Sequence, residues 1–215
     1  MDDGRRPRQA RVTLTHSFQS VVRGRRMTRS FTEQPVEDTV IERLVDVASR
    51  APSAGKAQGW HLVVLRGGET ATFWDNTLPV SRRETFRWPG LLRAPVIVVA
   101  LADPQAYVDR YAEPDKAATG LGAGPHAWPT PYWTVDASMA VMSLLLAAQD
   151  EGLGALFFAV FNGAAEVRAA LGIPDRLQLV GAIALGWPQP ADGRAGLSAS
   201  RQRRSADEII HRGGW

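Results

Sequence analysis

Residues 135–161, VDASMAVMSLLLAAQDEGLGALFFAVF, combine a long helix signal with a strand signal. The first part is apolar on nearly every side for about five helical turns, which predicts a helix that is buried or lies at an interface. Gly152 and Gly154 are typical of a helix C-terminus, and the ALFFAVF that follows them predicts a strand. We therefore expect a central helix followed directly by a strand of the main sheet.

The flanking sequence supplies the other elements of an α+β sandwich. Residues 93–104, RAPVIVVALADP, hold a β-branched run that is typical of a central strand buried on both faces. Residues 104–131 are rich in Gly and Pro and predict an irregular, lid-like excursion. Further helices are expected at residues 17–26, 35–51, 69–88 and 164–173, and further strands at 61–65 and 178–188.

The chain has 215 residues and no cysteine. The length suits one domain, which we place at residues 14–215, after a flexible basic arm at residues 1–13. Without cysteine there is no disulfide, Cys-ligated metal or thiol nucleophile, so redox chemistry would require a bound cofactor. No apolar run approaches the roughly 20 residues of a membrane-spanning helix, and no secretory signal is visible. A cytoplasmic protein without membrane contact is the simplest interpretation.

Positive charge is concentrated at both ends of the chain. Residues 1–29 carry eight Arg and two Asp, and residues 194–215 carry five Arg against one Asp and one Glu. The middle of the chain holds 12 basic and 18 acidic residues, so it is acidic. Arginine favours bidentate contacts with anions, and the basic ends indicate a phosphate-bearing partner, either a nucleic acid or a cofactor.

Two arginine groups are candidates for that phosphate. Residues 25–29, RRMTR, place three guanidiniums at the end of the first expected helix, where Arg25 and Arg29 could converge while Arg26 points elsewhere. The alternative is an ordinary solvated helix end. Near the C-terminus, RQRR at residues 201–204 precedes a helix-like ADEIIHRGG; here the alternative is a disordered basic tail. Together the two groups could clamp one phosphate.

Other chemical signatures are weak or missing. The four histidines are scattered without metal-ligand spacing, and there is no GxSxG elbow for a catalytic serine. GLGAGP at residues 120–125 follows no strand, so it does not match a dinucleotide-binding fingerprint. Residues 52–55, PSAG, are either a plain connection or a place where small residues let backbone amides approach a ligand.

Four sequence blocks, in this order and spacing, resemble the nitroreductase family of FMN-dependent flavoproteins over about residues 17–212. They are VVRGRRMTRSF, APSAGKAQGWHLVVL, residues 135–161, and LVGAIALGWP followed by RRSADEIIHRGGW. The resemblance implies an α+β sandwich with a mixed, mainly antiparallel sheet flanked by helices. It also implies a homodimer with FMN in two clefts at the subunit interface.

The resemblance also implies which residues contact FMN. The phosphate and ribityl chain would be held by Arg25, Arg26, Met27 and Arg29, with Arg203 and Arg204 closing on the same phosphate. The flavin would be reached from the partner subunit by Pro52, Ser53, Ala54 and Gly55. Backbone amides near flavin N5 and O4 would come from Phe157, Phe158, Ala159 and Val160.

Three residues depart from the family pattern. Met27 replaces the usual Ser, Lys56 stands where Asn is usual, and Gly59 replaces the Pro of the common QPW. Lys56 could contact the flavin or an anionic substrate, or it could be an ordinary surface lysine. These changes concern substrate preference more than the flavin site itself.

The implied reaction is ping-pong hydride transfer from NAD(P)H through flavin N5 to a nitroaromatic, a quinone or a similar conjugated acceptor. The side chains of Phe86, Trp88, Trp128 and Trp133 are expected either to line the acceptor side or to be core or dimer contacts. One alternative is a specialised flavin enzyme that catalyses reductive dehalogenation, flavin fragmentation or a biosynthetic oxidation. Another is a nucleic-acid-binding or regulatory module, but no recognition motif supports it, and we expect neither a nucleic-acid partner nor a bound metal.

Overall fold

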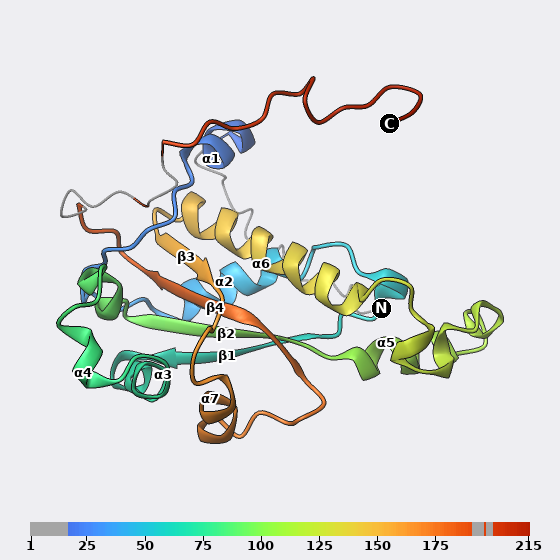
Figure 1. The fold of residues 1–215 in the computed structure, drawn as a ribbon, viewed down its shortest axis with the longest axis horizontal. Helices are drawn as coiled ribbons and strands as arrows, with labels where there is room; N and C mark the ends of the chain where they lie inside the picture. Colours follow the sequence, from blue (N-terminus) through green and yellow to red (C-terminus); the bar gives the residue numbers. More distant parts are fainter. Residues whose placement is uncertain (1–16, 191–195, 197–199) are drawn as a thin grey trace, which may run out of the picture.

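The computed structural model describes residues 17–190, 196 and 200–215, and the expected basic arm at residues 1–13 lies outside this part. Its sheet has the strand order β1-β2-β4-β3, with antiparallel pairing throughout (Figure 1). The strands are β1 (Trp60–Arg66), β2 (Val96–Ala102), β3 (Gly154–Phe158) and β4 (Gln178–Gly186). The predicted mainly antiparallel sheet is therefore confirmed, with a single parallel bridge between Met27 and Ala155 outside the named strands.

Helices cover both faces of the sheet. They are α1 (Phe18–Gly24), α2 (Asp38–Ala48), α3 (Thr70–Thr77), α4 (Val80–Arg83), α5 (Pro104–Ala112), α6 (Tyr132–Asp150) and α7 (Ala164–Ala170). One core packs α2 and α6 against one face of β2 and β4, and a second core packs α3 and α7 against the other face (Figure 1). The predicted sandwich is the observed arrangement.

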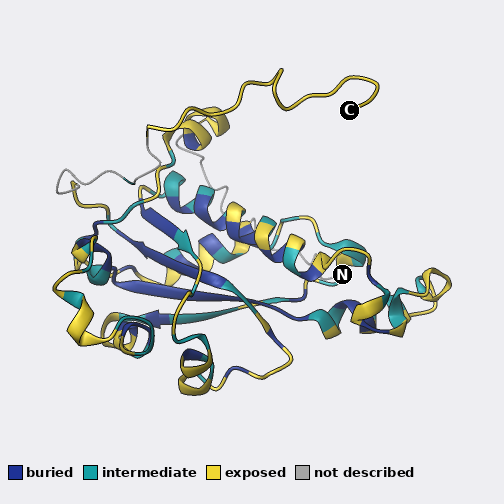
Figure 2. Cartoon of the chain, viewed as in Figure 1, coloured by how far each residue is buried: buried dark blue, intermediate teal, exposed yellow. Residues whose placement is uncertain are grey.

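The burial of β2 on both faces explains why its sequence is an unbroken apolar run. All seven of its residues are buried, because β1 and β4 flank it and helices cover both of its faces (Figure 2). Figure 2 also shows that α6 is not uniformly buried, with exposed residues along its length. The predicted central strand is confirmed.

Four expectations are corrected by the structure. The helix expected at residues 69–88 divides into α3 and α4 and ends at Arg83. The region 104–131 begins with α5, because Asp103 caps that helix by accepting a hydrogen bond from Gln105 N and Pro104 occupies its first turn. The strand expected to continue to residue 161 ends at Phe158. The helix-like segment at residues 206–214 forms only a turn, in a C-terminal segment whose residues 200–215 are all exposed and which extends away from the body (Figure 1).

Candidate functional site

The arginine-rich segment at residues 25–29 lies along β3, one of the two edge strands of the sheet. Thr28 N–H donates to the Ala155 carbonyl at 3.0 Å. A side chain at Gly154 would collide with Thr28, since a Cβ there would lie 2.6 Å from the Thr28 hydroxyl oxygen. The segment therefore reaches the strand through a glycine that permits close contact, and its backbone is fixed relative to the sheet.

Two of the three arginines turn toward the same residue. Arg25 Nη1 lies 3.4 Å from Met27 Sδ, and Arg29 Nη1 donates to the Met27 carbonyl at 3.2 Å. Arg26 has a different task, because its Nη1 donates to the carbonyls of Arg23, Gly24 and Arg25 at 2.6, 3.2 and 3.1 Å. These carbonyls lie at the C-terminus of α1, which Arg26 therefore caps.

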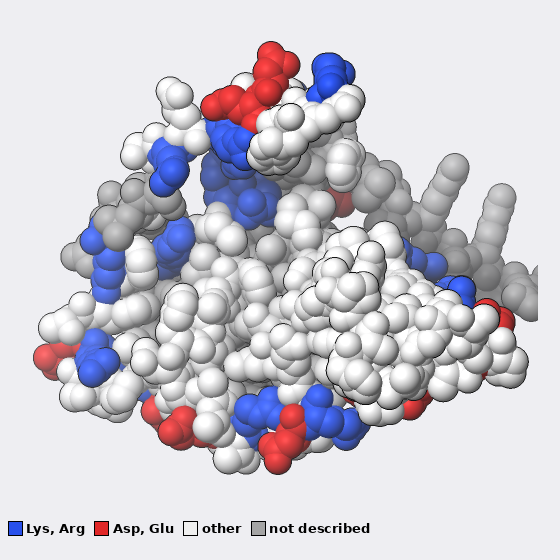
Figure 3. All heavy atoms as spheres, turned by 45° about the vertical axis from the view of Figure 1, so that its right-hand side comes forward, with Lys and Arg blue, Asp and Glu red and all other residues white. Residues whose placement is uncertain are grey.

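The C-terminal segment meets this arginine pair at one point. A Cβ on Gly196 would lie 3.1 Å from Arg29 Nη1, so the backbone passes directly over that guanidinium. Figure 3 shows Lys and Arg side chains gathered beneath the C-terminal segment at the top of the view. Arg203 and Arg204 are exposed, and Arg204 Nη2 donates to the Glu208 carbonyl within the same segment. Arg204 thus contacts the C-terminal segment to which it belongs.

The small-residue loop at residues 52–58 is anchored by a buried carboxylate. Asp136 on α6 is 2% exposed, and its Oδ2 accepts hydrogen bonds from Ala54 N–H at 2.7 Å and from the Tyr107 hydroxyl at 2.8 Å. Burial raises the pKa of the Tyr107 phenol far above its ordinary value, and Asp136 adds to that rise, whereas a hydrogen bond with Ser53 opposes it. The phenol therefore remains a donor to Asp136.

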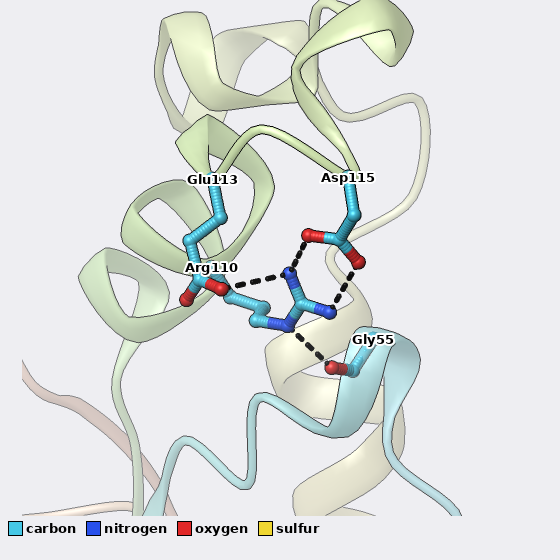
Figure 4. Close-up of polar contacts among 4 residues, drawn as sticks. All are labelled: Gly55, Arg110, Glu113 and Asp115. Atoms are coloured by element: carbon cyan, nitrogen blue, oxygen red, sulfur yellow. Dashed lines mark hydrogen bonds and ion pairs between the residues drawn. The ribbon is translucent and has the colours of Figure 1, made fainter.

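A second anchor comes from α5. Arg110 Nε donates to the Gly55 carbonyl at 2.8 Å, while its two terminal nitrogens form a bidentate pair with Asp115, each at 2.8 Å (Figure 4). The Arg110 hydrogen bond holds the pKa of the Asp115 carboxyl below its ordinary value. Glu113 adds a contact to Arg110 at 3.2 Å. The loop is thus fixed to two helices.

The loop has an unusual backbone. Gly55, Lys56 and Gln58 have φ values of 59°, 60° and 50°, so two non-glycine residues occupy the left-handed region. Close packing explains why position 59 is Gly rather than the Pro of the common QPW. A Cβ there would lie 2.7 Å from the Tyr107 ring and 2.8 Å from Ala106 Cβ. This backbone packs against α5 with no space for a side chain. Such local strain is typical of functional loops.

The arginine segment and the small-residue loop lie at opposite ends of α6. Gly24, just before the arginines, lies beside Gln149, since a Cβ on Gly24 would be 3.6 Å from Gln149 Nε2. The loop instead contacts Asp136, 13 residues earlier on the same helix. At 1.5 Å per residue, the two regions are separated by about 20 Å along the helix.

Comparison with known proteins places this fold and its site segments in one family. The model of the Nitroreductase family matches residues 22–187, which include the arginine segment, the small-residue loop, α6 and the whole sheet. The chain belongs to the nitroreductase family. The resemblance inferred from the four sequence blocks is therefore confirmed.

Relatives within the nitroreductase family differ in what they do. The 4-nitrobenzoate reductase of Nocardioides sp. is 26% identical, with 94% of this chain and 92% of the relative covered. The 5,6-dimethylbenzimidazole synthase of Rhodospirillum rubrum is 28% identical, with 77% of this chain and 79% of the relative covered. A solved structure from Exiguobacterium sibiricum, named as a nitroreductase in complex with FMN, matches with a TM-score of 0.68 at 16% identity, covering 93% and 98% of the two chains.

The predicted site segment at residues 157–160 lies at the end of β3, and its aromatic side chains pack in the core. Phe157 and Phe158 alternate between the two cores, and Phe158 stacks on Trp74 with ring centroids 6.1 Å apart. Their side chains face the protein interior, which leaves the main chain of this strand end and of the following Ala159 and Val160 as the groups available to a ligand.

The structure describes no helix long and apolar enough to cross a membrane.

The aromatic side chains expected to line the acceptor side divide into two groups. Trp128 and Trp133 are each 8% exposed and lie in an aromatic cluster around Tyr107, where their indole N–H groups donate to Leu121 O and Gln178 Oε1. This burial favours the alternative that these two residues are core contacts rather than part of the acceptor side. Phe86 and Trp88 are half-buried and pack edge to face at 6.1 Å.

The sequence patterns did not indicate the residues that hold the small-residue loop, namely Asp136, Tyr107 and Arg110. One sequence signal pointed to Asp136, because it is the only charged residue of α6 before Asp150. A carboxylate in such a helix is seldom buried unless it has partners. The partners themselves come from distant segments, so their identity requires the tertiary structure.

Proposed function

We propose that this chain is an FMN-dependent NAD(P)H oxidoreductase that works as a homodimer, with each FMN bound between the arginine segment of one subunit and the small-residue loop of its partner. The observation that carries this proposal is the separation of about 20 Å between the two segments along α6. A two-fold dimer that pairs opposite ends of the two α6 helices would bring them together.

An apolar stripe on α6 supplies the surface for that dimer. Its members recur at alternating spacings of three and four residues and are at least partly exposed: Tyr132, Val135, Met139, Met142 and Leu146. Val135 and Met142 are 38% and 40% exposed, although α6 is apolar along nearly its whole length. Such a seam is typical of helix–helix packing, and exposed apolar patches of this kind mark interaction sites.

The residues present fit the phosphate of FMN. Arg25 and Arg29 each use one Nη1 contact to Met27, which leaves the other guanidinium N–H groups for an anion. Both are half-buried, so a phosphate there is partly shielded from water and its charge-assisted bonds are stronger. Arg203 and Arg204 remain proposed partners of that phosphate, and Met27, Pro52, Ser53, Ala54, Gly55 and Lys56 remain proposed contacts of the cofactor.

When bound, FMN supplies two-electron chemistry at N5. The chain has no cysteine, and none of its other side chains can supply this chemistry. The chain contributes binding and orientation. Arginines fix the phosphate, the anchored loop presents a small-residue surface to the flavin, and the main chain at residues 157–160 offers donors near N5 and O4. NAD(P)H and the acceptor bind in turn at one face, and the acceptor is a nitroaromatic, a quinone or a similar conjugated compound.

Purified protein tests the proposal directly. We expect a yellow dimer with one FMN per subunit, which oxidises NADH or NADPH when an acceptor such as 4-nitrobenzoate or a quinone is added. Arg25→Gln should weaken FMN binding at least tenfold by removing a charge-assisted phosphate contact. Arg26→Gln is the matched control and should change it less than threefold, because Arg26 caps α1. A colourless protein that takes up no FMN would contradict the proposal.

A second candidate is a specialised flavin enzyme, which the 28% identity to a 5,6-dimethylbenzimidazole synthase favours. Stopped-flow reduction distinguishes the two candidates. Rapid reduction of the bound flavin by NADH or NADPH supports the oxidoreductase. If neither nicotinamide reduces it, mass spectrometry of the products formed from free reduced FMN and oxygen tests for flavin fragmentation.

A further inference from the structure

Arg29 rests on an aromatic face. Its guanidinium carbon lies 5.3 Å from the ring centroid of Trp88, a residue 59 positions away in the chain. A guanidinium within about 6 Å of an indole centroid is attracted by the negative face of the ring, most strongly where water is partly excluded. Both residues are half-buried, so this contact is shielded.

The backbones around these two residues are joined in a fixed register. Phe31 N–H donates to the Gly90 carbonyl at 3.2 Å, and Arg93 Nε donates to the Phe31 carbonyl at 3.1 Å. Arg93 Nη2 also lies 3.3 Å from the Ser30 hydroxyl. The segment that begins with Trp88 therefore holds the chain that follows Arg29, and the backbones that carry the indole and the guanidinium are fixed relative to each other.

Other contacts restrict Arg29 without saturating it. Its Nη1 donates to the Met27 carbonyl, and Gly196 passes over the guanidinium from the C-terminal segment. The indole Nε1 of Trp88 is buried and has no hydrogen-bond partner in the described part of the chain. Packing and two guanidiniums, those of Arg29 and of Arg87 at 5.7 Å from the ring centroid, hold the indole, rather than a hydrogen bond. The face of the ring is therefore the group that acts on Arg29.

We propose that Trp88 is a positioning residue, which holds the Arg29 guanidinium in the orientation that binds the phosphate of FMN. The inference rests on the proposed function, because it requires Arg29 to be a phosphate ligand. An arginine side chain loses considerable rotamer freedom when it binds an anion. Stacking on Trp88 removes part of that freedom beforehand, and the phosphate then binds more tightly to a preorganised site.

The test compares FMN with riboflavin, which has the same ring system and no phosphate. Dissociation constants of both are measured on apoprotein by quenching of flavin fluorescence. In Trp88→Leu, FMN affinity should fall about fivefold to tenfold, while riboflavin affinity should change less than about twofold. An equal loss for both ligands, or no loss for either, would overturn the proposal.

Conservative variants separate positioning from packing. Trp88→Phe keeps an aromatic face and loses no hydrogen bond, because the indole Nε1 has none, so it should retain most of the preference for FMN. Phe86→Leu alters the ring that packs edge to face with Trp88 and should leave the FMN-to-riboflavin ratio unchanged. If Trp88→Leu does not fold, Trp88→Met fills more of the space and replaces it.

Arg29→Gln distinguishes failure of this inference from failure of the proposed function. If the apoprotein binds no FMN, the proposed function is wrong. If it binds FMN but Arg29→Gln does not lower the FMN-to-riboflavin ratio, Arg29 is not a phosphate ligand, and this inference is wrong while the proposed function stands. If Arg29→Gln does lower the ratio but Trp88→Leu does not, only the role of Trp88 is wrong. In the double variant, Trp88→Leu should add no further change to the ratio, because its effect passes through Arg29.

Discussion

Asp136 Oδ2 accepts the backbone N–H of Ala54 at 2.7 Å, across 82 positions of sequence. The same oxygen accepts the Tyr107 hydroxyl at 2.8 Å, so one buried carboxylate joins α6, α5 and the small-residue loop. The two hydrogen bonds offset the cost of burying the carboxylate. Removing the carboxylate leaves both donors unpaired. The position of the loop therefore depends on a residue that lies outside it.

We expect Asp136→Ala to lower the free energy of unfolding by about 2–4 kcal/mol, because two buried donors lose their acceptor. Chemical denaturation with urea measures the change. The matched control is Asp46→Ala on α2, whose side chain is 67% exposed and which should cost less than about 0.5 kcal/mol. A similar cost for the two variants would show that Asp136 does not anchor the loop.

Backbone strain in the loop should make two neighbouring substitutions act in opposite directions. Gly55→Ala should destabilise the protein by about 1–3 kcal/mol, because φ is 59° and a Cβ would lie 2.8 Å from the Tyr111 ring. Lys56→Asn should stabilise it by about 0.5–1 kcal/mol, since Asn tolerates a φ of 60° better than Lys does. Thermal unfolding measures both effects.

Lys116→Asn is the control for this pair, because Lys116 is the only other lysine and has a φ of −120°. It should show no gain in stability. A stabilisation of Lys116→Asn equal to that of Lys56→Asn would mean that lost charge, rather than relieved strain, is the cause.

Substitution in the apolar stripe should dissociate the proposed dimer. Met142→Glu places a charge in the middle of the stripe, and burying that charge without a partner is unfavourable. Analytical ultracentrifugation should show a monomer at micromolar concentration, with loss of bound FMN in the same sample. Val80→Glu, on α4 and 69% exposed, should remain dimeric and yellow. A Met142→Glu dimer with full FMN content would exclude this face as the interface.

The ion pair between Arg43 and Glu151 should give stability a defined pH dependence. The two contacts measure 2.8 and 2.9 Å, and the hydrogen bond from Arg43 lowers the pKa of Glu151 below its ordinary value of 4.5. A lowered folded-state pKa means that the pair stabilises the protein above the unfolded-state pKa. This contribution is lost as pH falls through the folded-state pKa.

Glu151→Gln should therefore lower stability by about 0.5–1 kcal/mol at neutral pH and by progressively less toward about pH 3. Melting temperatures of both proteins across that range measure the difference. Asp46→Asn is the more exposed comparison and should show a smaller change. A difference for Glu151→Gln that stays constant with pH would show that packing, not charge, accounts for it.

Local patterns in the sequence were sufficient for much of the fold. The continuous apolar run of β2 predicts a strand with neighbours on both sides, and the apolar length of α6 predicts a helix with an interface, because both patterns report burial directly. The start of α5 was missed although Asp103 and Pro104 signal it, since the surrounding Gly and Pro favoured an irregular interpretation. The expected helix in the C-terminal segment is a turn with few tertiary contacts to extend it.

The sequence by itself determined the family, the absence of thiol chemistry, and the two charged ends of the chain. Only the tertiary structure decided which residues act together. Arg26 caps a helix while Arg29 stacks on Trp88, and Asp136 holds a loop 82 residues away. The physical reason is that a hydrogen bond or a cation–π contact depends on positions in space to within a fraction of an ångström. Those positions arise from the packing of all the elements around the sheet, which no local pattern records.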